Sequence, residues 1–142
     1  MNDLLAQRIA EIVEENIEGI KPFTFAALDD GQIGLLNNGY KITFGPGSSA
    51  RRTTGRPPSG GLFVGREITI TFSWENKIRD AKAKSEREEQ ANAVNRYSQV
   101  IRAIDSDEKI FEMAKNFNFV GDSGIIEGKQ LFLLETTFNL EL

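Results

Sequence analysis

The sequence predicts an α+β domain in which a mainly antiparallel sheet carries an N-terminal helix and a central helix on one face. Three observations predict this class: an amphipathic N-terminal segment, a second helical segment mid-chain, and alternating polar and apolar runs on both sides of it. A chain of 142 residues has ordinary single-domain size, and its sequence contains no repeat. We therefore expect residues 1–142 to form one domain.

The first helix is predicted over residues 3–18. Its apolar stripe at helical spacing consists of Leu5, Ile9, Ile12, Val13 and Ile17. Asn2 or Asp3 can cap its start, and Gly19 followed by Pro22 ends it. A loop or short strand then leads to a turn at residues 29–31.

Two strands are predicted next, on either side of a long loop. The first covers about residues 32–44, with a tight turn or bulge at 37–39. The second, residues 66–75, is the clearest strand in the sequence. Its apolar residues Ile68, Ile70, Phe72 and Trp74 alternate with polar ones, which predicts one buried and one hydrated face. Phe72 and Trp74 are therefore expected in the core.

The loop between these strands, residues 45–61, has an unusual composition. It contains five glycines, three prolines and three arginines, and no acidic residue. This composition cannot bury a core, so we expect a long projecting loop. It lacks the lysine of a phosphate-binding loop. Two interpretations stay open: an ordinary solvated loop tip, or an interface with a phosphate or an acidic protein surface. The candidate interface residues are Arg51, Arg52, Arg56, Pro57 and Pro58.

The second half of the chain predicts two helices. A charged stretch, residues 76–89, leads into a helix that ends near Ile104. The expected apolar stripe of this helix is Val94, Tyr97, Val100, Ile101 and Ile104. The acidic run 105–108 ends this helix and provides the N-cap of a second, short helix, which continues through Lys115.

A closing hairpin follows. Short strands are expected over 116–120 and 124–127, then a tight turn at Gly128-Lys129 and a last strand over 130–142. One face of the last strand carries Phe132, Leu134, Thr136, Phe138, Leu140 and Leu142. A strand that continues to the last residue is held by pairing, within the chain or with a neighbouring subunit.

The composition excludes most familiar catalytic machinery. With neither cysteine nor histidine, the chain has no thiolate nucleophile and lacks the usual zinc ligands and proton-transfer residue. The triplet Asp122-Ser123-Gly124 matches the catalytic motif of aspartic proteases, but Gly121 stands where that motif has an apolar residue and the helix content is too high for that all-β fold. A turn between two strands explains the triplet without further assumption. The acidic pair Asp29-Asp30 and the run 105–108 lack the spacing of a calcium loop. We predict no enzyme activity, no cofactor and no metal.

Charge and hydropathy restrict the location and the partners. The net charge of −4 argues against a surface that tracks nucleic acid. No apolar run has the length of a membrane span, and the N-terminal segment lacks the basic start of a signal peptide. A protein made and used in a cytoplasm is expected.

The order of elements resembles the tail terminator, or tail-completion, proteins of long-tailed bacteriophages. The resemblance rests on four segments: the helix over 4–17, the strand over 66–74, the charged lead-in with the helix over 91–104, and the strand over 131–142 after a glycine turn. The resemblance lies in the order and pattern of the elements, and it covers nearly the whole chain. Head-to-tail connector and neck proteins are near neighbours.

The resemblance implies a structural virion protein that forms a hexameric ring in the tail or neck and is assembled in the host cytoplasm. Such a ring would cap the tail tube, stop its polymerisation and join it to the head, with DNA passing through. Its partners would be a tail tube protein and a neck or connector protein, and the arginine loop would contact an adjacent ring. The residues Glu67, Thr69 and Thr71 either line a subunit seam or form a plain hydrated sheet face. A nucleic-acid- or peptide-binding module that uses the arginine loop, and an enzyme dependent on carboxylates alone, are the alternatives.

Overall fold

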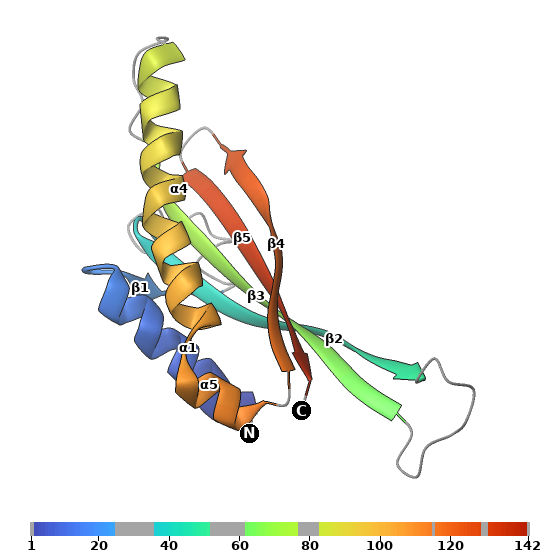
Figure 1. Ribbon diagram of the computed structural model, residues 1–142. Helices are drawn as coiled ribbons and strands as arrows, with labels where there is room; N and C mark the ends of the chain where they lie inside the picture. Colours follow the sequence, from blue (N-terminus) through green and yellow to red (C-terminus); the bar gives the residue numbers. More distant parts are fainter. Residues whose placement is uncertain are drawn as a thin grey trace.

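The computed structural model describes residues 2–24, 36–51, 62–76, 83–114, 116–128 and 131–141. Its elements are α1 (Asn2–Asn16), β1 (Lys21–Pro22), β2 (Gly39–Arg51), β3 (Leu62–Glu75), α4 (Ala83–Asp105), α5 (Glu108–Met113), β4 (Asn116–Glu127) and β5 (Leu131–Glu141). The strands form one sheet of order β1-β2-β3-β5-β4, antiparallel except for the short β1–β2 pair. Both long helices lie on the same side of this sheet (Figure 1). The predicted α+β class is confirmed.

Helix α1 matches its predicted helix closely. The five predicted stripe residues are all buried, and the last of them, Ile17, directly follows the helix. The helix ends at Asn16, two residues before the predicted end, and Gly19 reverses the chain with a φ of +76° that favours glycine. Leu5, Ile9 and Val13 have no exposed surface, so each contributes about 1.5–3 kcal/mol of apolar burial. The stripe therefore fastens α1 to the sheet.

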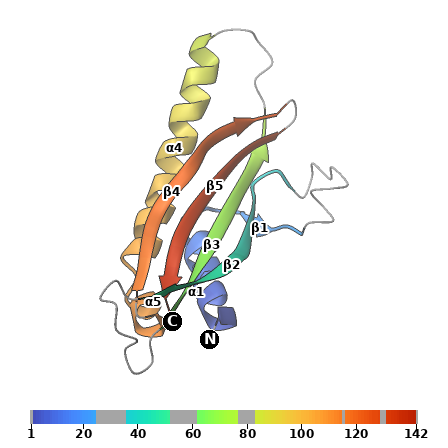
Figure 2. The same cartoon turned by 90° about the vertical axis from the view of Figure 1, so that its right-hand side faces the viewer.

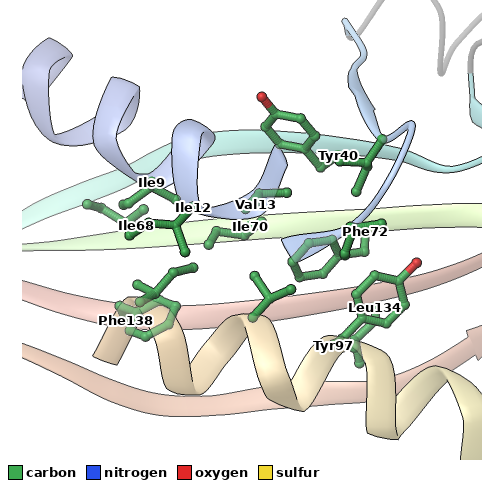
Figure 3. Close-up of a cluster of buried hydrophobic side chains, with 14 of the residues drawn as sticks. Ile9, Ile12, Val13, Tyr40, Ile68, Ile70, Phe72, Tyr97, Leu134 and Phe138 are labelled. Atoms are coloured by element: carbon green, nitrogen blue, oxygen red, sulfur yellow. The ribbon is translucent and has the colours of Figure 1, made fainter. Parts of the chain in front are cut away.

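The covered face of the sheet is formed by alternate residues of β3 and β5. The predicted β3 residues Ile68, Ile70, Phe72 and Trp74 are buried, as are Phe132, Leu134, Thr136, Phe138 and Leu140 of β5. The register pairs Phe72 with Leu134 and Ile68 with Phe138, so the two apolar rows run side by side. Figure 3 shows them meeting α1 and α4 in one cluster.

Helix α4 is longer than its predicted helix and is rotated relative to it. It starts at Ala83, because residues 83–89 include strong helix formers such as Glu and Lys, and Lys84 pairs with Glu88 at 3.9 Å. Its buried side is Ala93, Tyr97, Val100 and Ile104. Val94, predicted on that side, is 50% exposed. The Tyr97 ring stacks on Phe72, with ring centroids 4.4 Å apart.

Strands β2 and β3 correct the predicted loop boundaries. Strand β2 begins at Gly39, after a turn in which Asn38 has a φ of +58°, and not near residue 32. It then continues to Arg51, and β3 begins at Leu62, so residues 45–51 belong to a strand. Ladder pairing satisfies their backbone groups without a core, and a register shift between Phe44 and Gly47 accommodates the glycine and proline there. Residues 52–61 lie outside the described residues.

The closing hairpin differs from the prediction in one respect. Residues 116–127 form one strand, β4, where two short strands were expected, because register shifts between Phe119 and Gly121 and between Asp122 and Ile125 absorb the extra residues. The turn begins where predicted: the Gly128 amide donates to the Leu131 carbonyl at 2.8 Å. Lys129, Gln130 and Leu142 lie outside the described residues.

Candidate functional site

The open face of the sheet carries the predicted seam residues. Glu67, Thr69 and Thr71 alternate with buried residues of β3, so they project from the side opposite the helices. Glu67 is exposed, and both threonines are half-buried. The structure thus brings the three residues together on one polar surface.

Neighbouring strands extend this surface sideways. Thr69 lies in register with Thr43 of β2 and Thr137 of β5, and the two hydroxyl oxygens of Thr69 and Thr137 are 3.3 Å apart. Strand β3 is the third of five strands, flanked by β2 and β5. A seam through these residues therefore requires another molecule to dock on the face of the sheet, because they do not reach its edge. The seam role stays a prediction.

The second candidate site is a two-stranded arm, defined here as residues 47–51 of β2 and 62–66 of β3. The β2–β3 pairing continues to Arg51 and Leu62, whereas the pairing of β3 with the described residues of β5 reaches only Gly65. The two strands therefore leave the body of the sheet together (Figure 1). At its base, the Arg66 guanidinium donates to the Gly45 carbonyl at 2.8 Å. This contact joins the two strands where β2 changes register.

The predicted interface residues relate to this arm in two ways. Arg51 is the last residue of β2, at the far end of the arm. Arg52, Arg56, Pro57 and Pro58 lie outside the described residues. By sequence, they belong to the segment that joins the two strands of the arm. Residues 45–66 carry four arginines and no acidic residue, while the chain as a whole is acidic.

The Asp122-Ser123-Gly124 triplet forms part of the backbone structure of β4. The Asp122 carboxylate accepts from the Gly124 amide at 2.8 Å, and the Ser123 hydroxyl accepts from the Glu135 amide at 3.1 Å. Gly124 has a φ of +69°. These contacts bridge the register shift in the strand, and they explain the triplet without any catalytic role.

The acidic run 105–108 serves a capping role. One oxygen of Asp107 accepts from the Ile110 amide at 3.2 Å, which caps α5 as predicted. The Arg8 guanidinium of α1 donates to both carboxylate oxygens of Asp107, at 2.8 and 3.0 Å. Arg8 holds the pKa of Asp107 below its ordinary value, and the Ile110 amide acts in the same direction. The spacing of residues 8 and 107 in the chain gave no signal for this pair.

The described part of the chain contains neither a cluster of metal-ligating side chains nor a helix that could cross a membrane. Within ranges 2–24, 36–51, 62–76, 83–114, 116–128 and 131–141, no three acidic side chains converge as a metal ion would require. Asp29 and Asp30 lie outside these ranges. None of the helices described there combines the length and apolar character needed to cross a bilayer.

Strand β4 contains a surface feature that the sequence did not single out. Phe119, Val120 and Ile126 are 41, 54 and 43% exposed, and all three lie on this edge strand. The sequence did contain a signal for this exposed edge. Residues 116–127 include several large apolar side chains and lack lysine and proline, the residues that commonly protect an edge strand from pairing with another molecule.

Comparison with known proteins adds no relative: no protein-family model matches the chain, and no curated protein matches its sequence. The arguments for function therefore rest on the fold, the surfaces and the pattern of elements described above. A fold by itself supports many functions.

Proposed function

We propose that this chain is a structural virion protein resembling a bacteriophage tail terminator. In this proposal it forms a hexameric ring that caps the tail tube, stops its polymerisation and joins the tail to the head or neck. It acts without catalysis or cofactor, in the virion tail or neck, after assembly in the host cytoplasm.

The observation that carries the proposal is the order of elements. The resemblance was based on four segments, and each is a regular element here: α1, β3, the C-terminal half of α4, and β5. Of the remaining elements, β1, β2 and β4 extend the same sheet, and α5 is a short helix after α4. This order supports the likeness at the level of architecture.

The arm supplies the contact that such a ring needs with its neighbours along the tail. A ring between a tube and a neck must present different surfaces to two partners. The arm projects from one end of the sheet and is rich in arginine, which forms bidentate bonds with carboxylates. We assign the contact with an adjacent ring to Arg51, Arg52 and Arg56.

The test uses tail tubes assembled from the tube protein of the same phage. Adding the chain to growing tubes should yield tubes of arrested length with a ring at one end, scored by negative-stain electron microscopy. The variant Arg51→Ala/Arg52→Ala/Arg56→Ala should lose capping. A matched variant with exposed α4 arginines changed, Arg87→Ala/Arg102→Ala, should retain it. Tubes that grow unchanged with the wild-type chain would sink the proposal.

A nucleic-acid- or peptide-binding module is the second candidate, favoured by the same arginine-rich, acid-free segment. It predicts DNA binding that falls steeply with added salt and disappears in the triple arginine variant. A head-to-tail connector is the nearer alternative. It would bind the neck side of the joint and leave tube length unchanged.

A further inference from the structure

The turn before β2 contains a dipeptide with a chemistry of its own. Asn38 precedes Gly39, and every other asparagine of the chain precedes a residue that has a side chain. Asparagine is thermolabile, because the backbone nitrogen of the next residue can attack its side-chain carbonyl carbon. Glycine leaves that nitrogen unshielded, since it has no Cβ. By sequence, Asn38 is therefore the asparagine of this chain that is most prone to deamidation.

The reaction exchanges one C–N bond for another. The Gly39 amide nitrogen, after losing its proton to a base in solution, attacks Cγ of Asn38. The new N–Cγ bond closes a succinimide ring, the Cγ–Nδ2 bond breaks, and Nδ2 takes up a proton from solvent and leaves as ammonia. Water then opens the ring at either carbonyl carbon and yields aspartate or isoaspartate. The reaction therefore needs only water and base.

The fold holds Asn38 between the end of α1 and the sheet. Its Nδ2 atom donates to the Glu18 carbonyl at 3.1 Å, and its backbone carbonyl accepts from the Lys21 amide at 3.2 Å. These contacts define a β1–β2 junction, residues 18–21 together with 37–40. Figure 2 shows β1 beside β2 in this junction. The leaving nitrogen and the backbone of Asn38 are therefore both fixed.

The attacking nitrogen is fixed as well. Gly39 is buried and lies in register with Lys21 of β1 and with Ser73 of β3, so a strand on each side holds its backbone. The oxygen that would take up negative charge during the attack, Oδ1 of Asn38, is buried and accepts no hydrogen bond from any described residue. Charge that develops on such an oxygen is not stabilised. The folded junction therefore opposes the reaction at the nucleophile, the leaving group and the oxyanion.

We propose that Asn38–Gly39 is a latent deamidation site, which the folded β1–β2 junction protects and which reacts when the junction opens. Strand β1 has two residues, and so short a pairing opens locally at a lower cost in free energy than the core. The product is permanent, so an acidic residue at position 38 marks chains whose junction has opened. The inference is independent of the proposed function.

Conversion of Asn38 would also weaken the junction itself. An aspartate has no N–H group, so a carboxylate oxygen would face the Glu18 carbonyl where the amide now donates. The added negative charge would lie near the C-terminal end of α1, where the helix dipole disfavours it. An isoaspartate would in addition lengthen the main chain and disturb the pairing of Lys21 with Gly39.

The first test compares the folded and the unfolded chain. Both samples are kept in the same mildly alkaline buffer, without and with urea, and mass spectrometry of the digested chain follows the amide-to-acid mass gain at Asn38. The rate in the folded chain should be at least about tenfold lower than in urea. In urea, Asn118, which precedes Phe119, is the internal control and should convert more slowly than Asn38. Equal rates at Asn38 in the two states, or no conversion in urea, would overturn the inference.

The second test opens the junction and leaves the dipeptide unchanged. Lys21→Pro removes the amide that donates to the Asn38 carbonyl, so the rate at Asn38 in the folded chain should rise by about threefold or more. The control for general destabilisation is Gly124→Ala, which strains β4 and should raise the rate less. Circular dichroism verifies that both variants are folded. A wild-type rate in folded Lys21→Pro, or an equal rise in the two variants, would contradict protection by the junction.

The third test imitates the product. Asn38→Asp should lower the melting temperature, because it removes the donor to the Glu18 carbonyl. The matched control is Asn37→Asp: Oδ1 of Asn37 accepts from the Glu75 amide at 3.3 Å, and a carboxylate keeps that role. The melting temperature of this control should stay near the wild-type value. Equal losses in the two variants would refute the predicted effect of deamidation on the junction.

Discussion

The two faces of the sheet are built from alternate residues of the same strands, yet they have different tasks. In β3, Ile70 and Phe72 have no exposed surface, while Thr69 and Thr71, on either side of Ile70, remain half-exposed. The covered face packs apolar side chains from α1, α4, α5 and the strands β2, β3, β4 and β5 into one cluster. The open face carries Glu67, Thr69 and Thr71. Further along β3 on this face, Ser73 is buried and its hydroxyl donates to the Leu36 carbonyl at 2.6 Å, and Leu36 packs with Phe23 and Leu131 in a second, smaller cluster. Most buried apolar side chains therefore lie on one face, and we expect the packing of that face to dominate stability.

Paired substitutions on adjacent residues of β3 give the largest contrast. Phe72→Ala should lower the free energy of unfolding by about 3–5 kcal/mol, because it leaves a cavity beside the Tyr97 ring. Thr71→Ala, one residue away on the open face, should change it by less than about 0.5 kcal/mol. Urea denaturation measures both. Similar losses in the two variants would contradict the division of tasks between the faces.

The second largest effect is expected at alkaline pH, which should lower the free energy of unfolding through a buried residue of the covered face. Burial raises the pKa of Tyr97 to about 12 from its ordinary 10. The folded state therefore holds this proton more tightly than the unfolded state. The resulting stability is complete below pH 10 and is lost as the pH rises towards 12, a loss of about 2–3 kcal/mol. Tyr97→Phe should make the decline shallower and leave the share of Tyr40, whose pKa burial also raises to about 12. An equally steep decline in this variant would refute the assignment.

The Asp107 cap should give a smaller effect at neutral pH. Asp107→Ala should cost about 1–2 kcal/mol, because it removes the α5 cap, and it also removes the partner of Arg8. The control is Asp105→Ala, at the C-terminal end of α4, where an acidic side chain opposes the helix dipole; this change should be neutral or slightly stabilising. Thermal unfolding distinguishes them.

The same cap predicts an acid dependence. Because Arg8 lowers the pKa of Asp107, the carboxylate stabilises the fold above its ordinary pKa of 3.8, and this stabilisation is lost as the pH falls below that value. The difference between wild type and Asp107→Ala should shrink in that range. A difference that stays constant down to the lowest measurable pH would exclude the ionised cap as its cause.

The smallest effect concerns the register shifts of β4. Gly124→Ala should cost about 1 kcal/mol, since φ is +69° there and an alanine is strained in that conformation. Gly121→Ala provides the control: an added Cβ meets nothing within 4 Å at either position, and no positive φ occurs at Gly121. Equal melting temperatures for the two variants would contradict this account of the Asp122-Ser123-Gly124 turn.

The sequence predicted those features that depend on local periodicity. Alternation identified the buried row of β3, and helical spacing identified the stripe of α1. The prediction for α4 was wrong at Val94 because several rotations of an amphipathic helix fit the same spacing. Hydrophobicity alone did not identify Ala93, a small residue, as part of the side of α4 that faces the sheet.

Features that depend on pairing with distant residues were not predictable. Residues 45–51 lack core-forming side chains, yet ladder bonds to β3 make them a strand. The Arg8–Asp107 pair joins residues 99 positions apart, and nothing in either local segment indicates it. The exposed edge of β4 became visible only when the strand order placed it at the end of the sheet. The exposure of this strand was therefore a product of topology.

The central claim is that this chain assembles into a closed ring, and native mass spectrometry of the purified protein with matched negative-stain images tests it most directly. The account predicts one dominant species of six copies that appears as a ring. A single-copy mass that persists when tail tubes are added, with no rings in the images, would contradict it.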